Sequence, residues 1–174
     1  SYRKKLQLSI HRIGVKLPVD TLLDVISCLR NTSSASIIFS PRNMLKTPVI
    51  FLIFKRPNET ARVFEQIRKA QPPKLFIVAD GPRNDGEKKL TDAVRSVVEK
   101  IDWPCVVEQN YSEKNLGCRE RVASGLDWAF GRLTNPTDGA IILEDDCLPD
   151  QTFFAYCEEM LEKYKNEPKV MHIA

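Results

Sequence analysis

Three consecutive acidic residues follow an apolar segment in the last third of the chain. They are Glu144, Asp145 and Asp146, and residues 140–143 before them read Ala-Ile-Ile-Leu. Carboxylates gathered this closely repel one another unless a cation or a hydrogen-bond donor offsets their charge. Mg²⁺ and Mn²⁺ favour carboxylate and phosphate oxygens as ligands. The triplet therefore predicts a divalent-cation site.

The segment that carries the acids is expected to place them at the edge of a sheet. An apolar run without polar alternation, as at 140–143, is typical of a strand covered on both faces. In open α/β sheets, ligands bind outside the carboxyl ends of the strands. The alternative is that Asp145 and Asp146 are only turn residues. Asp150 is expected to cap the helix that follows.

From residue 48 onward, apolar runs alternate with amphipathic stretches. Four runs are predicted to be strands: 48–54, 75–80, 103–109 and 140–143. A fifth strand is predicted to begin at 170. Strands that alternate with helices form parallel sheets through right-handed crossovers. The sequence therefore predicts an α/β fold, with a mostly parallel sheet flanked by helices.

The stretches between these strands have the spacing of amphipathic helices. Asn58 is expected to cap the first helix, and residues 118–133 are expected to form the third. The inward residues of the first are predicted to be Ala61, Phe64, Ile67 and Ala70. The second has the clearest apolar stripe, which comprises Leu90, Ala93, Val94, Val97, Val98 and Ile101.

Polar residues follow every predicted strand, at the end where parallel strands share one edge. In chain order they are Lys55 and Arg56, Asp80 and Arg83, Asn110 and Asn115, and the acidic triplet. We expect them to converge on one rim. For Asp80 by itself, a role as a turn residue explains the sequence as well as a ligand contact does, because Asp-Gly is an ordinary turn signal.

No glycine-rich phosphate loop follows the first predicted strand. Neither G-x-x-x-x-G-K-[ST] nor G-x-G-x-x-G occurs there, which argues against a P-loop and a dinucleotide fingerprint. A metal ion held by the acids and bridging two phosphates would bind a diphosphate in another way.

Length and composition narrow the class of protein. A chain of 174 residues, 43% hydrophobic and 28% charged, suits one globular core, and no apolar run approaches a membrane span. The net charge of +3 is spread along the chain, which argues against a nucleic-acid partner. Five cysteines without a C-x-x-C pair favour a reducing compartment, and we expect a cytoplasmic location.

Residues 1–47 differ in texture from the rest and carry no chemical motif. We expect them to be an accessory segment or the remnant of a preceding domain, with the predicted fold in 48–174. The chain begins with Ser and shows no signal-peptide pattern, which indicates a processed chain or an excerpt.

The motifs of residues 48–174 resemble nucleotide-sugar glycosyltransferases of the GT-A fold. The likeness is carried by VADGP, by the N-x-G-x7-G spacing of Asn115, Gly117 and Gly125, and by ILEDDCLPDQTFFAY. Within that fold the chain is similar to the N-acetylglucosaminyltransferase I type and to family 2. Their D-x-D motif here has the Glu-Asp-Asp form. The resemblance implies a Rossmann-like nucleotide-diphospho-sugar transferase fold, truncated to its donor-binding half.

The resemblance also implies an activity and a cofactor. The chain would be a metal-dependent hexosyltransferase that moves a sugar from a nucleotide-sugar, a UDP-sugar, to the hydroxyl of a saccharide or another acceptor. The cofactor would be Mn²⁺ or Mg²⁺, with Asp146 as its main protein ligand. The catalytic base would lie beyond Ala174, so no catalytic residue is assigned.

Residue by residue, the resemblance implies contacts with the rest of the donor. Asp80 would hydrogen-bond the base, and Arg56 would lie near the base or the ribose. Glu144 and Asp145 would contact the ribose, the sugar or metal-bound water. Arg121 would help to hold the diphosphate.

Two other classes of function remain open. A sugar nucleotidyltransferase shares the architecture, but it should have a glycine-rich loop after the first strand, where KRPNET has none. A non-catalytic module could be a nucleotide- or metal-binding relic of the donor half, or a receiver-like domain. A receiver would need acids after the first strand, where Lys55 and Arg56 stand.

Overall fold

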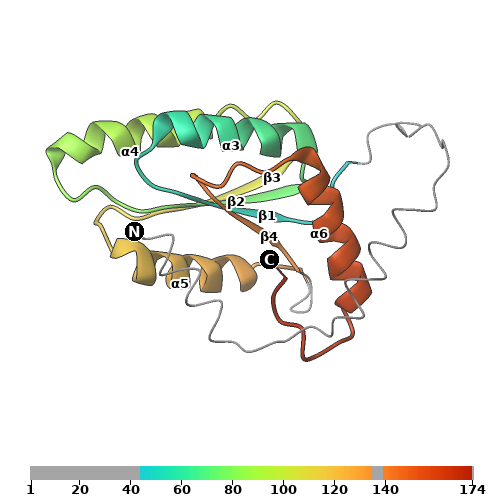
Figure 1. Cartoon of the computed structure of the whole chain (residues 1–174). Coiled ribbons are helices and arrows are strands. Elements are labelled where there is room, and N and C mark those ends of the chain that lie inside the picture. Colours follow the sequence, from blue (N-terminus) through green and yellow to red (C-terminus); the bar gives the residue numbers. More distant parts are fainter. Residues whose placement is uncertain (1–43, 135–138, 174) are drawn as a thin grey trace. The chain divides into compact units, whose positions relative to one another are not determined.

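The computed structural model describes residues 44–134 and 139–173. Residues 1–43 of the segment expected over 1–47 therefore lie outside the described residues. Strands and helices alternate through the described part (Figure 1). In chain order they are β1 (Val49–Ile53), α3 (Pro57–Ala70), β2 (Lys74–Ala79), α4 (Asp85–Val97), β3 (Val106–Tyr111), α5 (Gly117–Phe130), β4 (Ile141–Glu144) and α6 (Gln151–Tyr164).

The four strands form one parallel sheet in the order β3-β2-β1-β4. In its register, Leu52 of β1 lies opposite Val78 of β2 and Glu144 of β4. Because all neighbours are parallel, the carboxyl ends of these strands share one edge. The prediction of an α/β fold with a parallel sheet flanked by helices is confirmed.

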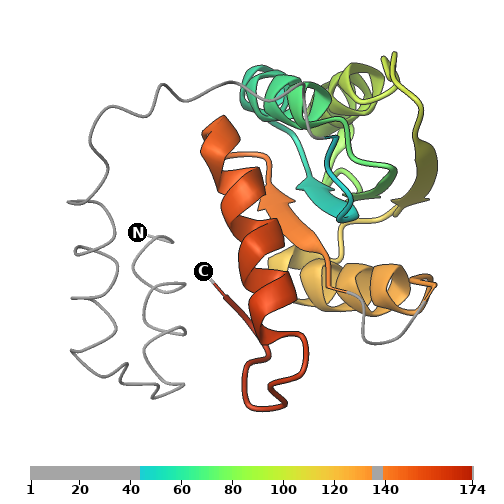
Figure 2. The same ribbon diagram turned by 90° about the vertical axis from the view of Figure 1, so that its right-hand side faces the viewer.

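Helices pack on both faces of the sheet (Figures 1 and 2). The helices α3, α4 and α6 cover one face, where Phe51 and Ile77 are buried. On the other face, α5 covers Ile50, Phe76 and Val78. Both β1 and β2 are therefore buried on both sides, as their continuous apolar runs predict.

The last strand differs from this prediction. β4 lies at the edge of the sheet, and Ile142 is 37% exposed. Within the described ranges, the helix on that face is α5, which packs on β1 and β2. The prediction that 140–143 are covered on both faces is therefore wrong.

Two helices begin or turn differently from the sequence pattern. α3 begins at Pro57 with Arg56 at its N-cap, so Asn58 is not the cap. Ala61 of α3 is exposed. In α4, Leu90 is 43% exposed while Thr91 is buried. The buried face of this helix is therefore rotated from the apolar stripe that the sequence predicts. The cap predicted at Asp150 is confirmed, because its side chain accepts the Thr152 N–H at 2.9 Å.

Other boundaries shift for local reasons. β3 begins at Val106 rather than 103, since Pro104 has no N–H for a strand ladder. α5 ends at Phe130, with Gly131 at its C-cap, rather than at 133. The fifth strand does not form over 170–173, where no described strand lies alongside and Met171 is 94% exposed.

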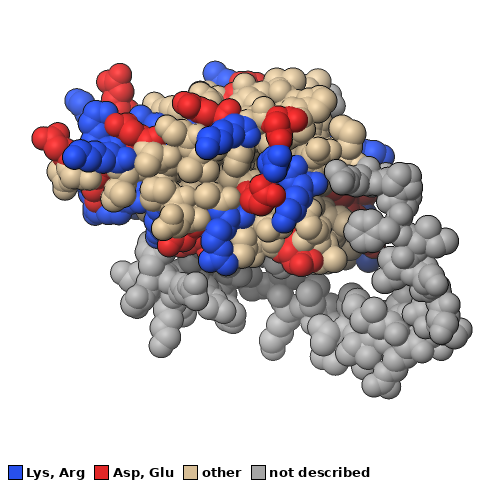
Figure 3. Space-filling view, turned by 90° about the horizontal axis from the view of Figure 1, so that it is seen from above, with Lys and Arg blue, Asp and Glu red and all other residues tan. Residues whose placement is uncertain are grey.

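The face formed by α3 and α4 carries both signs of charge (Figure 3). Arg68 lies 3.4 Å from Glu65, and Lys88 lies 2.8 Å from Asp92. Positive and negative side chains are interspersed here, so this face has no single-sign stripe. None of the helices in 44–134 and 139–173 is long and apolar enough to cross a membrane.

Candidate functional site

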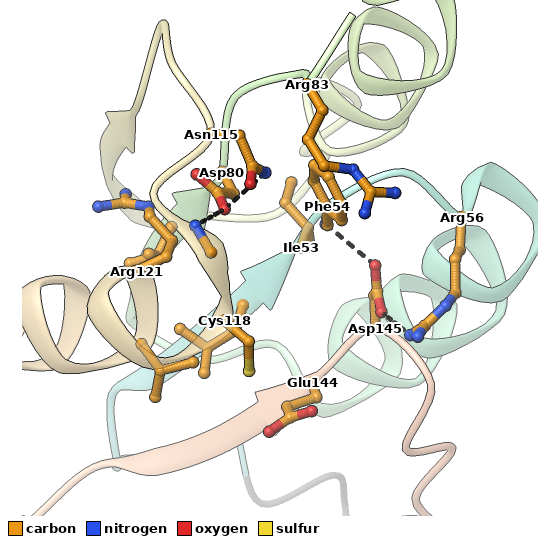
Figure 4. Close-up of a pocket in the computed structure, with 14 residues that line it drawn as sticks. Ile53, Phe54, Arg56, Asp80, Arg83, Asn115, Cys118, Arg121, Glu144 and Asp145 are labelled. Carbon is orange, nitrogen blue, oxygen red and sulfur yellow. Dashed lines mark hydrogen bonds and ion pairs between the residues drawn. The ribbon is translucent and has the colours of Figure 1, made fainter. Parts of the chain in front are cut away.

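A pocket of about 270 Å³ opens at the edge where β1, β2 and β4 end (Figure 4). It contains every residue for which the sequence predicts a contact with the donor. These are Arg56 after β1, Asp80 after β2, Arg121 on α5, and Glu144 and Asp145 at the end of β4. The structure thus brings together side chains from four separate segments.

The acids after β4 differ in their surroundings. Asp145 is 4% exposed, and its Oδ2 accepts the backbone N–H of Phe54 at 3.0 Å. Its Oδ1 accepts Nη1 of Arg56 at 2.8 Å. Asp146 is more exposed, and its Oδ2 lies 2.9 Å from the same nitrogen of Arg56. One guanidinium therefore bridges two acids and ties the loop after β1 to the end of β4.

Glu144 lines the pocket without such a partner. No residue in the described part of the chain donates a hydrogen bond to its carboxylate. Burial raises its pKa, and the charges of Asp146 and Asp145 raise it further. The pKa of Asp145 is also raised, chiefly by burial, despite the N–H of Phe54 and the charge of Arg56. The acids are thus only partly neutralised by the protein.

A divalent cation would neutralise the negative charge that remains on these acids. The oxygen donors are those that Mg²⁺ and Mn²⁺ prefer, and Asp146 is the most exposed of the three acids. Within 44–134 and 139–173, no group of three or more acidic, histidine or cysteine side chains is arranged to hold a metal. Such ions are often bound by one or two carboxylates together with substrate phosphates. Asp146 and Glu144 would need phosphate oxygens to complete the coordination.

Asp80 lines the pocket, but its carboxylate is already saturated. Its Oδ1 accepts the N–H groups of Gly81 and Leu116, both at 2.9 Å. Its Oδ2 accepts the N–H of Gly117 at 3.1 Å and Nδ2 of Asn115 at 3.0 Å. A carboxylate offers about four acceptor sites, and all four are used here. Asp80 therefore fastens the start of α5 to the end of β2.

The two glycines of the predicted spacing allow this fastening. Gly117 has φ of +78°, in the left-handed region that favours glycine. Gly125, two turns along α5, faces β2, where an added Cβ would lie 2.4 Å from Cγ1 of Val78. The glycines thus let α5 begin against Asp80 and lie close to the sheet.

Arg121 points away from the centre of the pocket (Figure 4). It is 6% exposed, its Nε donates to the carbonyl of Ala79 at 3.1 Å, and its Nη2 donates to Oδ1 of Asn110 at 2.9 Å. Burial lowers its pKa. Through Nε and Nη2 the side chain joins α5 to the ends of β2 and β3.

Arg83, which was expected at the rim without a specific contact, also belongs to the pocket. Its Nε lies 3.0 Å from Glu87 on α4. Lys55 pairs with the same carboxylate. The ring of Phe54 lies beneath both cations, with Nζ of Lys55 5.4 Å from its centroid. The i,i+4 spacing of Arg83 and Glu87 was a signal for this pair.

No protein-family model matches the sequence, and no curated protein matches it significantly. The geometry of the pocket is therefore the basis for inferring what the chain does.

Proposed function

We propose that residues 48–174 are the donor-binding half of a metal-dependent glycosyltransferase of the GT-A fold. The donor is a nucleotide-sugar, with UDP-sugars as the first candidates, and the acceptor is the hydroxyl of a saccharide or another molecule. A cytoplasmic location, expected from the cysteine count, belongs to the same proposal. We assign no catalytic base.

The observation that carries the proposal is the convergence in the pocket. Arg56 and Asp80 follow β1 and β2, Glu144 is the last residue of β4, and all three line one cavity at the edge where open α/β sheets bind ligands. The volume of about 270 Å³ is slightly below the roughly 300–1,000 Å³ of typical small-molecule pockets. We expect it to enclose the nucleoside end of the donor and to leave the diphosphate beside the acids.

Glu144 and Arg56, which line the pocket, and Asp146, which does not line it but pairs with Arg56, have separate tasks in this proposal. Asp146 and Glu144 hold Mn²⁺ or Mg²⁺ together with the diphosphate oxygens. When bound, the cation stabilises the negative charge that develops on the leaving diphosphate. Arg56 keeps the acids in place, because it pairs with Asp145 and Asp146 at 2.8 and 2.9 Å.

A non-catalytic nucleotide- or metal-binding module is the second candidate. Asp80 and Arg121 favour it, since both oxygens of Asp80 and the Nε and Nη2 atoms of Arg121 are engaged within the protein. A sugar nucleotidyltransferase has less support, because the loop between β1 and α3 contains no glycine.

A thermal-shift screen of UDP, GDP, CDP and their sugars, with and without Mn²⁺, tests the proposal. A ligand that binds the folded state raises the midpoint of unfolding in proportion to its occupancy. Stabilisation by UDP or a UDP-sugar that requires Mn²⁺ supports the glycosyltransferase. Stabilisation without metal supports a simple nucleotide-binding module. The absence of a response to every nucleotide would refute the glycosyltransferase and favour a relic of the donor half.

A further inference from the structure

The side chain of Asn115 stands beside Asp80 at the wall of the pocket (Figure 4). Its Nδ2 donates to Oδ2 of Asp80 at 3.0 Å and to the carbonyl of Gly81 at 2.9 Å. Both N–H groups of the amide are therefore used, and these two acceptors determine which end of the amide is nitrogen.

The other end of this amide is an acceptor with capacity to spare. No described residue donates a hydrogen bond to Oδ1 of Asn115, and the side chain is partly exposed. Asp80 differs, because four N–H groups already occupy its two oxygens. An N–H group that enters the pocket can therefore be accepted by Asn115 without displacing an internal hydrogen bond. At Asp80 it would have to displace one.

We propose that Asn115 determines base specificity, by accepting an N–H of the ligand's base through Oδ1. Asp80 is a positioning residue, which holds the amide of Asn115 and the start of α5 in place. This inference rests on the proposed function, since the base is that of the nucleotide donor. Uracil carries an N–H at ring position 3, whereas cytosine has a bare acceptor nitrogen there. We assign Oδ1 of Asn115 to ring position 3, where it favours uridine over cytidine nucleotides, because the N–H groups of cytosine lie on its exocyclic N4 instead.

The rigidity of the site strengthens this preference. Two hydrogen bonds hold the carboxamide before any ligand arrives, so binding does not have to order it. A ligand without the N–H leaves the acceptor desolvated and unpaired, which costs affinity.

The test uses UDP and UDP methylated at N3, each titrated in the presence of Mn²⁺ by calorimetry. The intact 174-residue chain should bind UDP roughly twofold to tenfold more tightly than the methylated ligand, the net worth of one hydrogen bond. In Asn115→Ala the two affinities should become equal. Val122→Ala removes part of the pocket wall but no acceptor, so it should change both affinities by the same factor.

A second measurement avoids the risk that Asn115→Ala misfolds. In the unsubstituted chain, the ¹³C signal of the Asn115 side-chain carbonyl should shift with UDP and remain in place with the methylated ligand. Equal binding of both ligands by the intact chain, or a preference that survives Asn115→Ala, would overturn the assignment to Asn115. Failure of UDP to bind at all would instead overturn the proposed function, and this inference with it.

Discussion

The carboxylate of Asp145, at the end of β4, accepts the backbone N–H of Phe54, the residue after β1, at 3.0 Å. Its second oxygen accepts the guanidinium of Arg56 at 2.8 Å. The middle acid of the triplet is thus an internal anchor that joins two neighbouring strand ends. On either side of it, Glu144 remains available to a ligand, while Asp146 shares Nη1 of Arg56 and is the more exposed partner of that nitrogen.

This anchor predicts a difference between two substitutions of Asp145. Asp145→Ala should lower the free energy of unfolding by about 2–3 kcal/mol, because it leaves the N–H of Phe54 without its charged acceptor. Asp145→Asn keeps an acceptor oxygen and loses only the charge opposite Arg56, which is half exposed, so it should cost about 1 kcal/mol or less. Urea denaturation at pH 7 measures both. Equal losses would show that Phe54 does not depend on this side chain.

The pairing of Glu87 predicts a pH dependence of stability. Hydrogen bonds from Arg83 and Lys55 hold the pKa of Glu87 well below its ordinary value of 4.5. A depressed folded-state pKa contributes stability that is complete above the unfolded value and is lost as pH falls below it. Stability should therefore decrease between pH 4.5 and more acidic pH, and Glu87→Gln should reduce this decrease.

Two acids of the pocket, Glu144 and Asp145, change the stability in the opposite direction as pH falls. The pKa values of Glu144 and Asp145 are raised, so their protonation as pH falls favours the folded state. The difference between the intact chain and Glu87→Gln, measured by denaturation at each pH, isolates Glu87 from them. Parallel pH curves for the two proteins would contradict the assignment.

The close approach of α5 to β2 predicts the effect of a single methyl group. Gly125→Ala would place Cβ 2.4 Å from Cγ1 of Val78, and it should destabilise the fold by about 1–3 kcal/mol through overpacking. Gly86→Ala, in the first turn of α4, meets only Oδ1 of Asn84 at 3.3 Å and should change stability little. Thermal unfolding compares the two, and similar midpoints would contradict the packing at Gly125.

Much of the site could be predicted because Arg56, Asp80 and the acids lie at or just after the ends of strands. The apolar runs of β1 and β2 are long and are bounded by turn residues, so the residues after them could be placed at one edge. The apolar run 140–143 gave no sign that β4 is an edge strand. Sheet order depends on which strands pair, and hydrophobic periodicity carries no information on that choice.

The roles of individual polar residues were harder to predict. The saturation of Asp80 depends on the backbone N–H groups of Leu116 and Gly117, which lie far along the chain and leave no trace in side-chain spacing. The rotation of α4 also depends on tertiary contacts. Glu87 is buried and pairs with Lys55, whereas Leu90 is 43% exposed.

The central claim is that Asp146 binds a cation that faces a diphosphate, and calorimetry tests it most directly. UDP should bind the intact chain at least about tenfold more tightly with Mn²⁺ than without it, a difference of about 1.4 kcal/mol. Asp146→Ala should abolish that difference. Asp150→Asn removes a nearby charge yet can still cap α6, so it should preserve the difference. Binding of UDP that is indifferent to Mn²⁺, or a metal dependence that survives in Asp146→Ala, would contradict the account.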